Sequence, residues 1–478
     1  MVEYFRNGRF FFIVSYINME FGGLTNAMLQ RARIFSKEAN LKPTILTFNF
    51  NPSYNLIRSH LLKKGKITSD ITILNMYEYY EKLPEMGLLP DDSYLDQDSL
   101  INYCKLKTVE EVFDSLGRLR KMIADDDDNG ITYEFYYTSN KRCFMVKQFQ
   151  RTAYGAYNEK ISLFDEGNRL IMVCNTDQEL IMHWLNVLST TEDPCFFIVD
   201  GRDMDQHILS FEKTNSLRIF VSHSIHIEEP YETDSPIKNT YRLLLNNFKK
   251  SDAIVLHTEA QKKDVELILG ENERLFVIPH CYKKPDNPPD FTKRDLKKAI
   301  VIARYHKVKQ LDHIIKAFKT VLDIIPNLRL ELYGKGDQEN VLSELIEKLQ
   351  LQDHVFLKGY SENPRDIFEE AAFSVVTSKS EGFSLATLES LSHGCPVISY
   401  DLKYGPSVMI NHGFNGYLVP KDDINSLAQK MKELFLNPEK LRFMSGNAYQ
   451  SINAFHEELF MDNWWALFQK ILVRRKFS

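Results

Sequence analysis

Cysteine is scarce in this chain of 478 residues, and the few that occur follow no metal-binding or disulfide pattern. The six cysteines are scattered along the sequence, and no two of them stand in C-x-x-C spacing. This scatter argues against thiolate metal sites and against a disulfide framework. It also favours a reducing compartment.

Long apolar runs and an excess of positive charge are missing as well. The short run from Phe10 to Val14 is bracketed by Glu3, Asn18 and Glu20, so we expect neither a signal peptide nor a transmembrane segment. The net charge of -6 excludes the basic excess of nonspecific nucleic-acid binders. We therefore expect a cytoplasmic protein with no nucleic-acid partner, and peripheral contact with the inner face of the cell membrane is an alternative.

The most informative stretch runs from Thr377 to Glu389. The apolar run before it predicts a buried parallel strand, and the pattern becomes helical after Gly382. A helix that begins near Ser384 points its unpaired N–H groups and its positive dipole end into the loop, which favours phosphate. Glu381 precedes this helix and Glu389 follows two turns later, so both carboxylates can border one ligand site.

Two motifs in this order resemble the donor site of retaining GT-B nucleotide-sugar glycosyltransferases, the family numbered 4. Glu381 and Glu389 match its E-x7-E motif, with a glycine after the first glutamate. Arg304 and Lys309 match its R-x4-K motif and follow an apolar strand. Two motifs in the right order make a chance match a poor explanation.

The resemblance implies a role for each of these residues. The leaving diphosphate gains negative charge as the glycosidic bond breaks, and this family stabilises it with protein groups, without a metal or another cofactor. Arg304 and Lys309 would bind the phosphates, Glu381 the donor sugar and Glu389 the ribose. The amides at the start of the helix would complete the phosphate seat: Phe383, Ser384 and Leu385. Ser384 stands where many family members have glycine, and its hydroxyl could contact phosphate or cap the helix.

Glycines mark two further loops. Gly22 and Gly23 lie between a first strand, 9–14, and a helix that begins near Thr25. Locally they indicate a tight turn. The resemblance implies a loop that closes over the donor diphosphate and the acceptor. Gly334, in the loop after the strand 328–333, is a further predicted donor-binding residue.

His223 and His226 follow a predicted strand in H-x-x-H spacing. Such a pair can bind zinc, but no third ligand stands at a suitable spacing, so we expect no metal site. In the teichoic-acid branch that the chain resembles, the second histidine of a matching pair lies beside the reacting sugar. The resemblance therefore assigns a catalytic role to His226.

Alternating strands and helices at both ends of the chain predict an α/β protein, and the resemblance implies a GT-B fold with two Rossmann-like domains facing a cleft. The expected parts are an N-terminal acceptor domain (1–75 and 175–284), an inserted β-rich domain (76–174), a nucleotide-sugar domain (292–457) and a C-terminal helix (458–478) that crosses back to the N-terminal domain.

The insertion begins with a charged, helix-prone stretch that contains Asp91 and Asp92. An aspartate-rich run follows at 125–130, and we interpret it as a solvated turn that does not bind calcium. Four short β-type runs then predict an antiparallel meander: 131–137, 142–149, 160–164 and 169–174.

The chain resembles the Gram-positive poly(polyol-phosphate) α-glycosyltransferases that decorate wall teichoic acid in four features: the inserted meander and the segments 18–23, 357–360 and 401–407. This implies transfer of glucose or N-acetylglucosamine from a UDP-sugar to poly(glycerol/ribitol phosphate), by a homotrimer built through the inserted domain. One alternative is a protein O-glycosyltransferase of serine-rich adhesins. Another is a non-catalytic chaperone subunit, against which the four intact motif residues argue.

Overall fold

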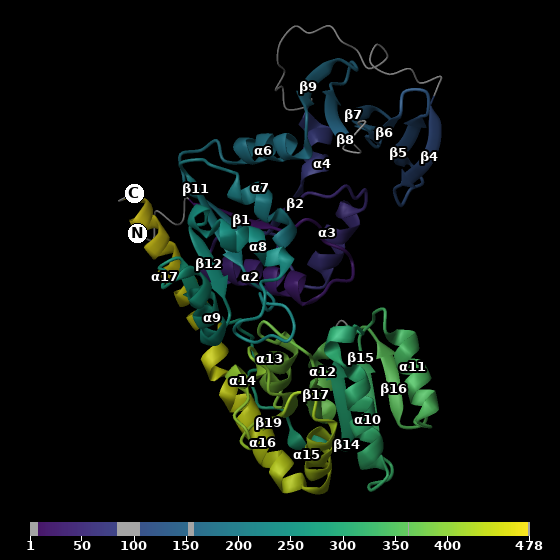
Figure 1. Ribbon diagram of the computed structural model, residues 1–478, viewed down its shortest axis with the longest axis vertical. Helices are drawn as coiled ribbons and strands as arrows, with labels where there is room; N and C mark the ends of the chain where they lie inside the picture. Colours follow the sequence, from purple (N-terminus) through teal and green to yellow (C-terminus); the bar gives the residue numbers. More distant parts are fainter. Residues whose placement is uncertain (1–7, 84–105, 152–156, 362, 477–478) are drawn as a thin grey trace. The chain divides into compact units, whose positions relative to one another are not determined.

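The structure is a computed structural model that describes residues 8–83, 106–151, 157–361 and 363–476. The chain forms two compact units, Met1–Ile219 with Lys249–Ser251, and Phe220–Phe248 with Asp252–Ser478. The described strands form three sheets, and Figure 1 labels many of these strands. The strand orders are β13-β12-β11-β10-β1-β2-β3, β16-β15-β14-β17-β18-β19 and β4-β5-β6-β7-β8-β9.

The first sheet has the short, continuously apolar strands typical of buried parallel sheets. β1 pairs in parallel with β2 and β10, β2 with β3, and β12 with β13. The strands are β1 Arg9–Ile13, β2 Thr44–Thr47, β3 Thr72–Asn75, β10 Cys195–Val199, β11 Ser216–Val221, β12 Ala253–Leu256 and β13 Leu275–Val277. The accompanying helices are α2 Gly23–Ala39, α3 Tyr54–Lys63, α4 Met76–Lys82, α6 Asp177–Leu188, α7 Asp205–Leu209, α8 Asn239–Asn246 and α9 Glu259–Leu269.

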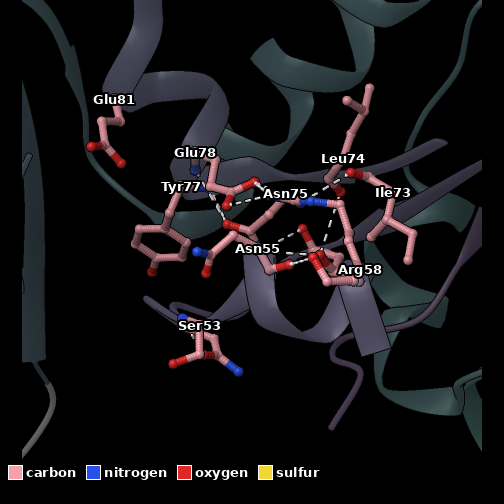
Figure 2. Close-up of polar contacts among 12 residues, drawn as sticks. Ser53, Asn55, Arg58, Ile73, Leu74, Asn75, Tyr77, Glu78 and Glu81 are labelled. Atoms are coloured by element: carbon pink, nitrogen blue, oxygen red, sulfur yellow. Dashed lines mark hydrogen bonds and ion pairs between the residues drawn. The ribbon is translucent and has the colours of Figure 1, made fainter. Parts of the chain in front are cut away.

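Asn75 fixes the point at which the chain leaves β3 for the insertion. Its Oδ1 accepts the N–H groups of Tyr77 and Glu78 at 3.0 and 3.2 Å, which caps α4 (Figure 2). Its Nδ2 donates to the carbonyl of Asn49 at 2.8 Å. Arg58 on α3 then binds Glu78 through both terminal nitrogens, at 2.7 to 2.9 Å. The exit from the sheet is therefore held by the Asn75 side chain and by the ion pair between α3 and α4.

The insertion is an antiparallel sheet, as predicted, but it has two more strands than the sequence suggested. The strands are β4 Lys107–Phe113, β5 Leu119–Asp126, β6 Ile131–Tyr137, β7 Cys143–Arg151, β8 Tyr157–Phe164 and β9 Leu170–Cys174. The helix-prone interpretation is wrong over β4 and β5, and the solvated-turn interpretation is wrong for Asp125 and Asp126, which belong to β5. Asp91 and Asp92 lie outside the described residues.

Paired charges explain why these two strands escaped sequence reasoning. Arg120 on β5 lies 2.8 Å from Glu81, and Lys121 lies 2.9 Å from Glu134 on β6. Asp126 is buried and accepts two hydrogen bonds from Asn129. Because partners on β6, on α4 and in the following turn satisfy these side chains, β5 forms without the apolar alternation that normally reveals a strand.

The C-terminal sheet is parallel in every pair of neighbouring strands and matches the predicted order of strands and helices. Its strands are β14 Asp295–Ile302, β15 Arg329–Tyr333, β16 Val355–Gly359, β17 Ala371–Val376, β18 Val397–Tyr400 and β19 Gly416–Val419. Its helices are α10 Leu311–Leu322, α11 Glu339–Lys348, α12 Pro364–Glu370, α13 Leu385–Ser392, α14 Pro406–Met409, α15 Ile424–Leu436 and α16 Pro438–Ser451. Two Rossmann-like parallel sheets with an inserted antiparallel sheet confirm the predicted fold class.

The last helix, α17 Glu457–Lys476, contacts the region of β12 and β13 within the second unit. Arg475 binds the Asp252 carboxylate at 2.7 and 3.0 Å, and this bond raises the pKa of the guanidinium. Lys470 lies 5.8 Å from the ring centroid of Phe276. Among the described residues, the helices are all too short or too polar to cross a lipid bilayer.

Candidate active site

The loop after β17 carries the predicted donor-site residues and is tied to the loop after β14. The Thr377 hydroxyl lies 3.0 Å from the carbonyl oxygens of both Lys309 and Gln310, and the Lys379 N–H donates to the Val308 carbonyl at 2.8 Å. These bonds bring the E-x7-E and R-x4-K motifs to the same end of adjacent strands.

Lys309 and Glu381 meet directly at this place. The Lys309 Nζ lies 2.6 Å from Glu381 Oε1, and the Ser378 hydroxyl donates to the same oxygen at 2.6 Å. Both charged side chains are largely buried, with exposed fractions of 26% and 14%. Arg304 lies in the same β14–α10 loop, and its side chain is exposed to solvent. The structure therefore joins one residue of each motif in an ion pair and leaves Arg304 open to a ligand.

Helix α13 begins where the sequence predicted. Ser384 is its N-cap in the left-handed region, with φ of 76°, and Phe383 and Leu385 flank it. The Ser384 hydroxyl lies 2.9 Å from the Thr387 hydroxyl, so it is engaged inside the first turn. The first turn contains no acidic residue that would cancel the positive end of the helix dipole. Glu389 is half-buried, one turn before the helix ends.

Glycines allow the strand-end loops of this unit to pack backbone against backbone. Gly334 has φ of 152°, and a Cβ there would lie 1.9 Å from the Ala303 carbonyl oxygen. A Cβ on Gly382 would lie 2.6 Å from the carbonyl oxygen of His223. No side chain fits at either position. The glycine after Glu381 therefore seats the donor loop on the segment that follows β11.

His226 is buried and stacks on Tyr404, with ring centroids 6.2 Å apart and planes inclined by 16°. Neither ring nitrogen has a hydrogen-bond partner among the described residues. Burial lowers the pKa of His226 to about 4; the Asp264 carboxylate opposes this shift, and the charges of Lys403 and Lys238 reinforce it. The imidazole is therefore neutral near pH 7, and both of its ring nitrogens are buried.

Tyr404 connects His226 to the wall of a cavity of about 340 Å³. The Tyr404 hydroxyl donates to the carboxylate of Asp264, which the Lys403 ammonium also approaches at 3.1 Å. Glu381, Lys379 and Tyr404 all line this cavity. The donor-loop carboxylate and the aromatic partner of His226 therefore share one cavity within the second unit.

Gly22 and Gly23 belong to the first unit, where Gly22 is the N-cap of α2 and Gly23 is the first residue of the helix. Gly22 has extended backbone angles, and a Cβ there would meet open space. The local backbone therefore does not demand glycine at Gly22. Their role in donor binding stays a prediction.

Sequence reasoning missed Tyr404 and Asp264, and it also missed that His257 and His280 lie beside His223. The ring centroids of His223 and His280 are 5.6 Å apart, and those of His257 and His280 are 3.8 Å apart. The available signal was a histidine within three residues of the end of each of β11, β12 and β13. The H-x-x-H spacing directed attention to His226 instead.

Comparison with known proteins agrees with this geometry. Residues 283–451 match the family described as glycosyl transferases group 1. The chain is 27% identical to the poly(glycerol-phosphate) alpha-glucosyltransferase of Bacillus subtilis, over 98% of this chain and 76% of that protein. It is 24% identical to the poly(ribitol-phosphate) alpha-N-acetylglucosaminyltransferase of Staphylococcus aureus, over 96% and 99%.

Solved structures show the same fold. One similar structure is that of the S. aureus TarM G117R mutant in complex with fondaparinux, alpha-GlcNAc-glycerol and UDP. It has a TM-score of 0.75 and 22% sequence identity, over 96% of this chain and 99% of that chain. The pneumococcal O-GlcNAc transferase GtfA, in complex with UDP and GlcNAc, reaches 0.70 at 18% identity, with 97% and 99% covered. Together with the motif geometry, these similarities identify a retaining, UDP-sugar-using glycosyltransferase whose residues 283–451 match group 1 and which is similar over nearly its whole length to polyol-phosphate glycosyltransferases.

Proposed function

We propose that this enzyme transfers glucose or N-acetylglucosamine from its UDP-sugar to poly(glycerol/ribitol phosphate) of wall teichoic acid, with retention at the anomeric carbon. The observation that carries the proposal is the Lys309–Glu381 pair, 2.6 Å apart, because its carboxylate partner Glu381 lines the same cavity as Tyr404. The near full-length similarity to two polyol-phosphate glycosyltransferases supports the acceptor class.

The chain offers fixed positive charge for the leaving group, so the proposed reaction needs no metal. Arg304 presents a fork suited to two phosphate oxygens, and Lys309 supplies a point charge. The amides at the start of α13, around Phe383, Ser384 and Leu385, add the helix field, because the first turn has no acidic residue. The bond between the anomeric carbon and the β-phosphate oxygen breaks, and UDP leaves with the electron pair.

The acceptor hydroxyl then attacks the anomeric carbon on the same face, and the leaving phosphate accepts its proton. Glu381 would hold donor-sugar hydroxyls and stabilise the positive charge that develops on the ring, and Glu389 would hold the ribose. His226 would hydrogen-bond to the reacting sugar as a neutral imidazole, which its lowered pKa supports. Gly22, Gly23 and Gly334 would allow backbone to approach the donor.

Three lysines in the cavity wall support an anionic acceptor. Lys379, Lys403 and Lys421 all line it. Lys421 also lies 4.9 Å from the ring centroid of Tyr231. Carboxylates balance part of this charge, since Lys379 pairs with Glu229 at 3.1 Å. Similarity to GtfA structures supports a second candidate, transfer to a protein hydroxyl.

The edge of the inserted sheet supports a homotrimer. β4 is an edge strand with its residues exposed or half-exposed, and the exposed fractions of Val109, Phe113 and Leu116 are 59%, 50% and 74%. An exposed edge with apolar side chains is suited to association with another chain. Light scattering on the purified protein should give three times the chain mass, and Phe113→Glu should lower that mass. A monomeric wild type, or a Phe113→Glu variant of unchanged mass, would contradict a homotrimer built through β4.

The reaction would take place in the cytoplasm at the inner face of the membrane. The scattered cysteines, none of them in C-x-x-C spacing, suit a reducing compartment.

The test offers purified enzyme each of radiolabelled UDP-glucose and UDP-N-acetylglucosamine with polyol-phosphate polymer, an adhesin fragment or water. We expect label in the polymer, at a rate that EDTA leaves unchanged. Lys309→Met and Glu381→Gln should lower transfer by at least about 100-fold. Lys348→Met and Glu347→Gln, on exposed positions of α11, should leave it unchanged. Label in the adhesin alone would establish the second candidate. Full activity of Lys309→Met would refute the donor-site assignment.

A further inference from the structure

Three parallel strand ends bring three histidines together in the second unit. His257 follows β12 directly, and His223 and His280 follow β11 and β13 by two and three residues. The Ser222 N–H donates to the Val255 carbonyl at 2.9 Å, and the Ile278 N–H donates to the Leu256 carbonyl at 2.9 Å, so the three strand ends are in register. One ring nitrogen from each histidine lies within 4.8 Å of the other two.

A hydrogen bond determines which ring nitrogen of His257 can act as an electron-pair donor. Its Nδ1 lies 2.8 Å from the carbonyl oxygen of Ile278. A carbonyl oxygen can only accept, so Nδ1 carries the proton and Nε2 carries the lone pair. Metal-ligating histidines are typically held by such a bond from the other ring nitrogen to a backbone carbonyl.

The spacing is close to that of a three-histidine metal site. Zn²⁺ bound tetrahedrally to imidazole nitrogens keeps those nitrogens about 3.3 Å apart. Closing from 4.8 Å requires only small rotations of the rings. His257 and His280 are buried, whereas His223 is half-buried and gives an ion a way in. Three imidazoles with a fourth position for water suit Zn²⁺ and related transition-metal ions, and do not suit Mg²⁺ or Ca²⁺.

We propose that His223, His257 and His280 bind one divalent transition-metal ion, Zn²⁺ above all, at the base of the donor loop. The donor loop rests on this cluster: Gly382 abuts the His223 backbone, and the Phe383 ring centroid lies 5.4 Å from that of His280 and 6.1 Å from that of His257. An ion here ties together the three strand ends beneath Gly382 and Phe383. It has no part in neutralising the diphosphate, which the proposed function assigns to Arg304 and Lys309.

The test is metal binding to the whole chain, freed of any affinity tag, stripped with EDTA and desalted. Titration with ZnCl₂ in a calorimeter should show one ion per chain, and Zn²⁺ should raise the melting temperature because it binds only the folded cluster. Co²⁺ should give the strong visible absorption of a tetrahedral site.

His223→Gln is the informative variant, since a half-buried side chain tolerates replacement best. It should weaken Zn²⁺ binding at least roughly tenfold and abolish the shift in melting temperature. His280→Gln should do the same. His412→Gln, which removes an exposed imidazole of the same unit, should bind Zn²⁺ as the wild type does.

Melting curves without metal show whether each variant is folded. The proposal is overturned if the wild type takes up no Zn²⁺ or Co²⁺, or if folded His223→Gln binds Zn²⁺ as tightly as the wild type. Either result would leave a packed cluster of neutral histidines. Transferase activity is measured separately, so failure of the proposed transfer reaction and failure of this metal site are distinguishable.

Discussion

Replacing Gly382 with alanine is the sharpest test of how the donor loop is positioned. The added Cβ would lie 2.6 Å from the His223 carbonyl oxygen and 2.9 Å from its carbonyl carbon. Both neighbours are backbone atoms at the end of a buried strand, so they cannot rotate away. To reach an ordinary contact of 3.4 Å, the loop must retreat by about 0.8 Å.

The displacement acts on the residue next to Glu381, so its effect should appear mainly in catalysis. A misplacement of about 1 Å in a positioned group can cost roughly 100-fold in rate. We therefore expect kcat/KM for the UDP-sugar to fall by about 10²-fold in Gly382→Ala, with a loss of about 1–3 kcal/mol in unfolding free energy from overpacking.

Gly446→Ala is the matched control. Gly446 lies inside α16, and a Cβ there meets nothing within 4 Å. This variant should keep full activity and gain about 0.5–1 kcal/mol, because alanine is the better helix former. Initial rates over a range of UDP-sugar concentrations measure kcat/KM for both variants, and urea unfolding measures the change in their unfolding free energy. If Gly382→Ala keeps activity within twofold of the wild type, the close seating of the loop on His223 does not position Glu381.

Three further predictions follow from single contacts. Lys309→Met should lower kcat/KM by about 10²–10³-fold, as expected for loss of a charge that stabilises the leaving group; a purely structural role would instead lower the melting temperature and spare the rate. His226 has a pKa of about 4 in the folded state, against an ordinary value of 6.5, so the folded state disfavours the protonated imidazole. The unfolded state therefore takes up the proton first as the pH falls. The free energy of unfolding should be highest above pH 6.5 and should decrease as the pH falls toward 4. The decrease amounts to at most about 3 kcal/mol. Urea unfolding at pH 7 and pH 4.5 should show a smaller pH dependence in His226→Gln than in the wild type. An equal pH dependence in the two proteins would contradict the lowered pKa of His226. Ser384→Gly relieves the left-handed backbone at φ of 76° and should raise the unfolding free energy by up to about 1 kcal/mol, unless the hydroxyl contact with Thr387 outweighs the strain, in which case calorimetry will show a lower melting temperature.

The parallel sheets could be predicted because their strands bury both faces. Runs such as Cys195–Val199 contain only apolar residues, and each ends at a polar loop. The same logic located Glu381 after β17 and the start of α13 near Ser384. The ion pair between Lys309 and Glu381 was not itself foreseeable, since two residues assigned to different parts of the ligand need not touch.

The remaining features depend on contacts between segments far apart in the chain. β5 was missed because the partner charges of Arg120 and Lys121 lie on other elements. Tyr404 and Asp264 are separated by 140 positions and belong to no motif with His226. The cluster of His223, His257 and His280 requires the strand order β11-β12-β13, which no spacing in the sequence reveals.

The capped junction at Asn75 has a consequence for how such enzymes diversify. Asn75 holds the chain where it leaves β3 for the insertion. Where the chain returns at α6, the N–H of Asp177 donates to Glu159, and the Asp177 carboxylate binds Lys147. The anchoring bonds at the exit join Asn75 to α4 and to Asn49, not to the strands of the insertion. A different module could therefore be inserted after α4 without altering the bonds that Asn75 makes at the end of β3.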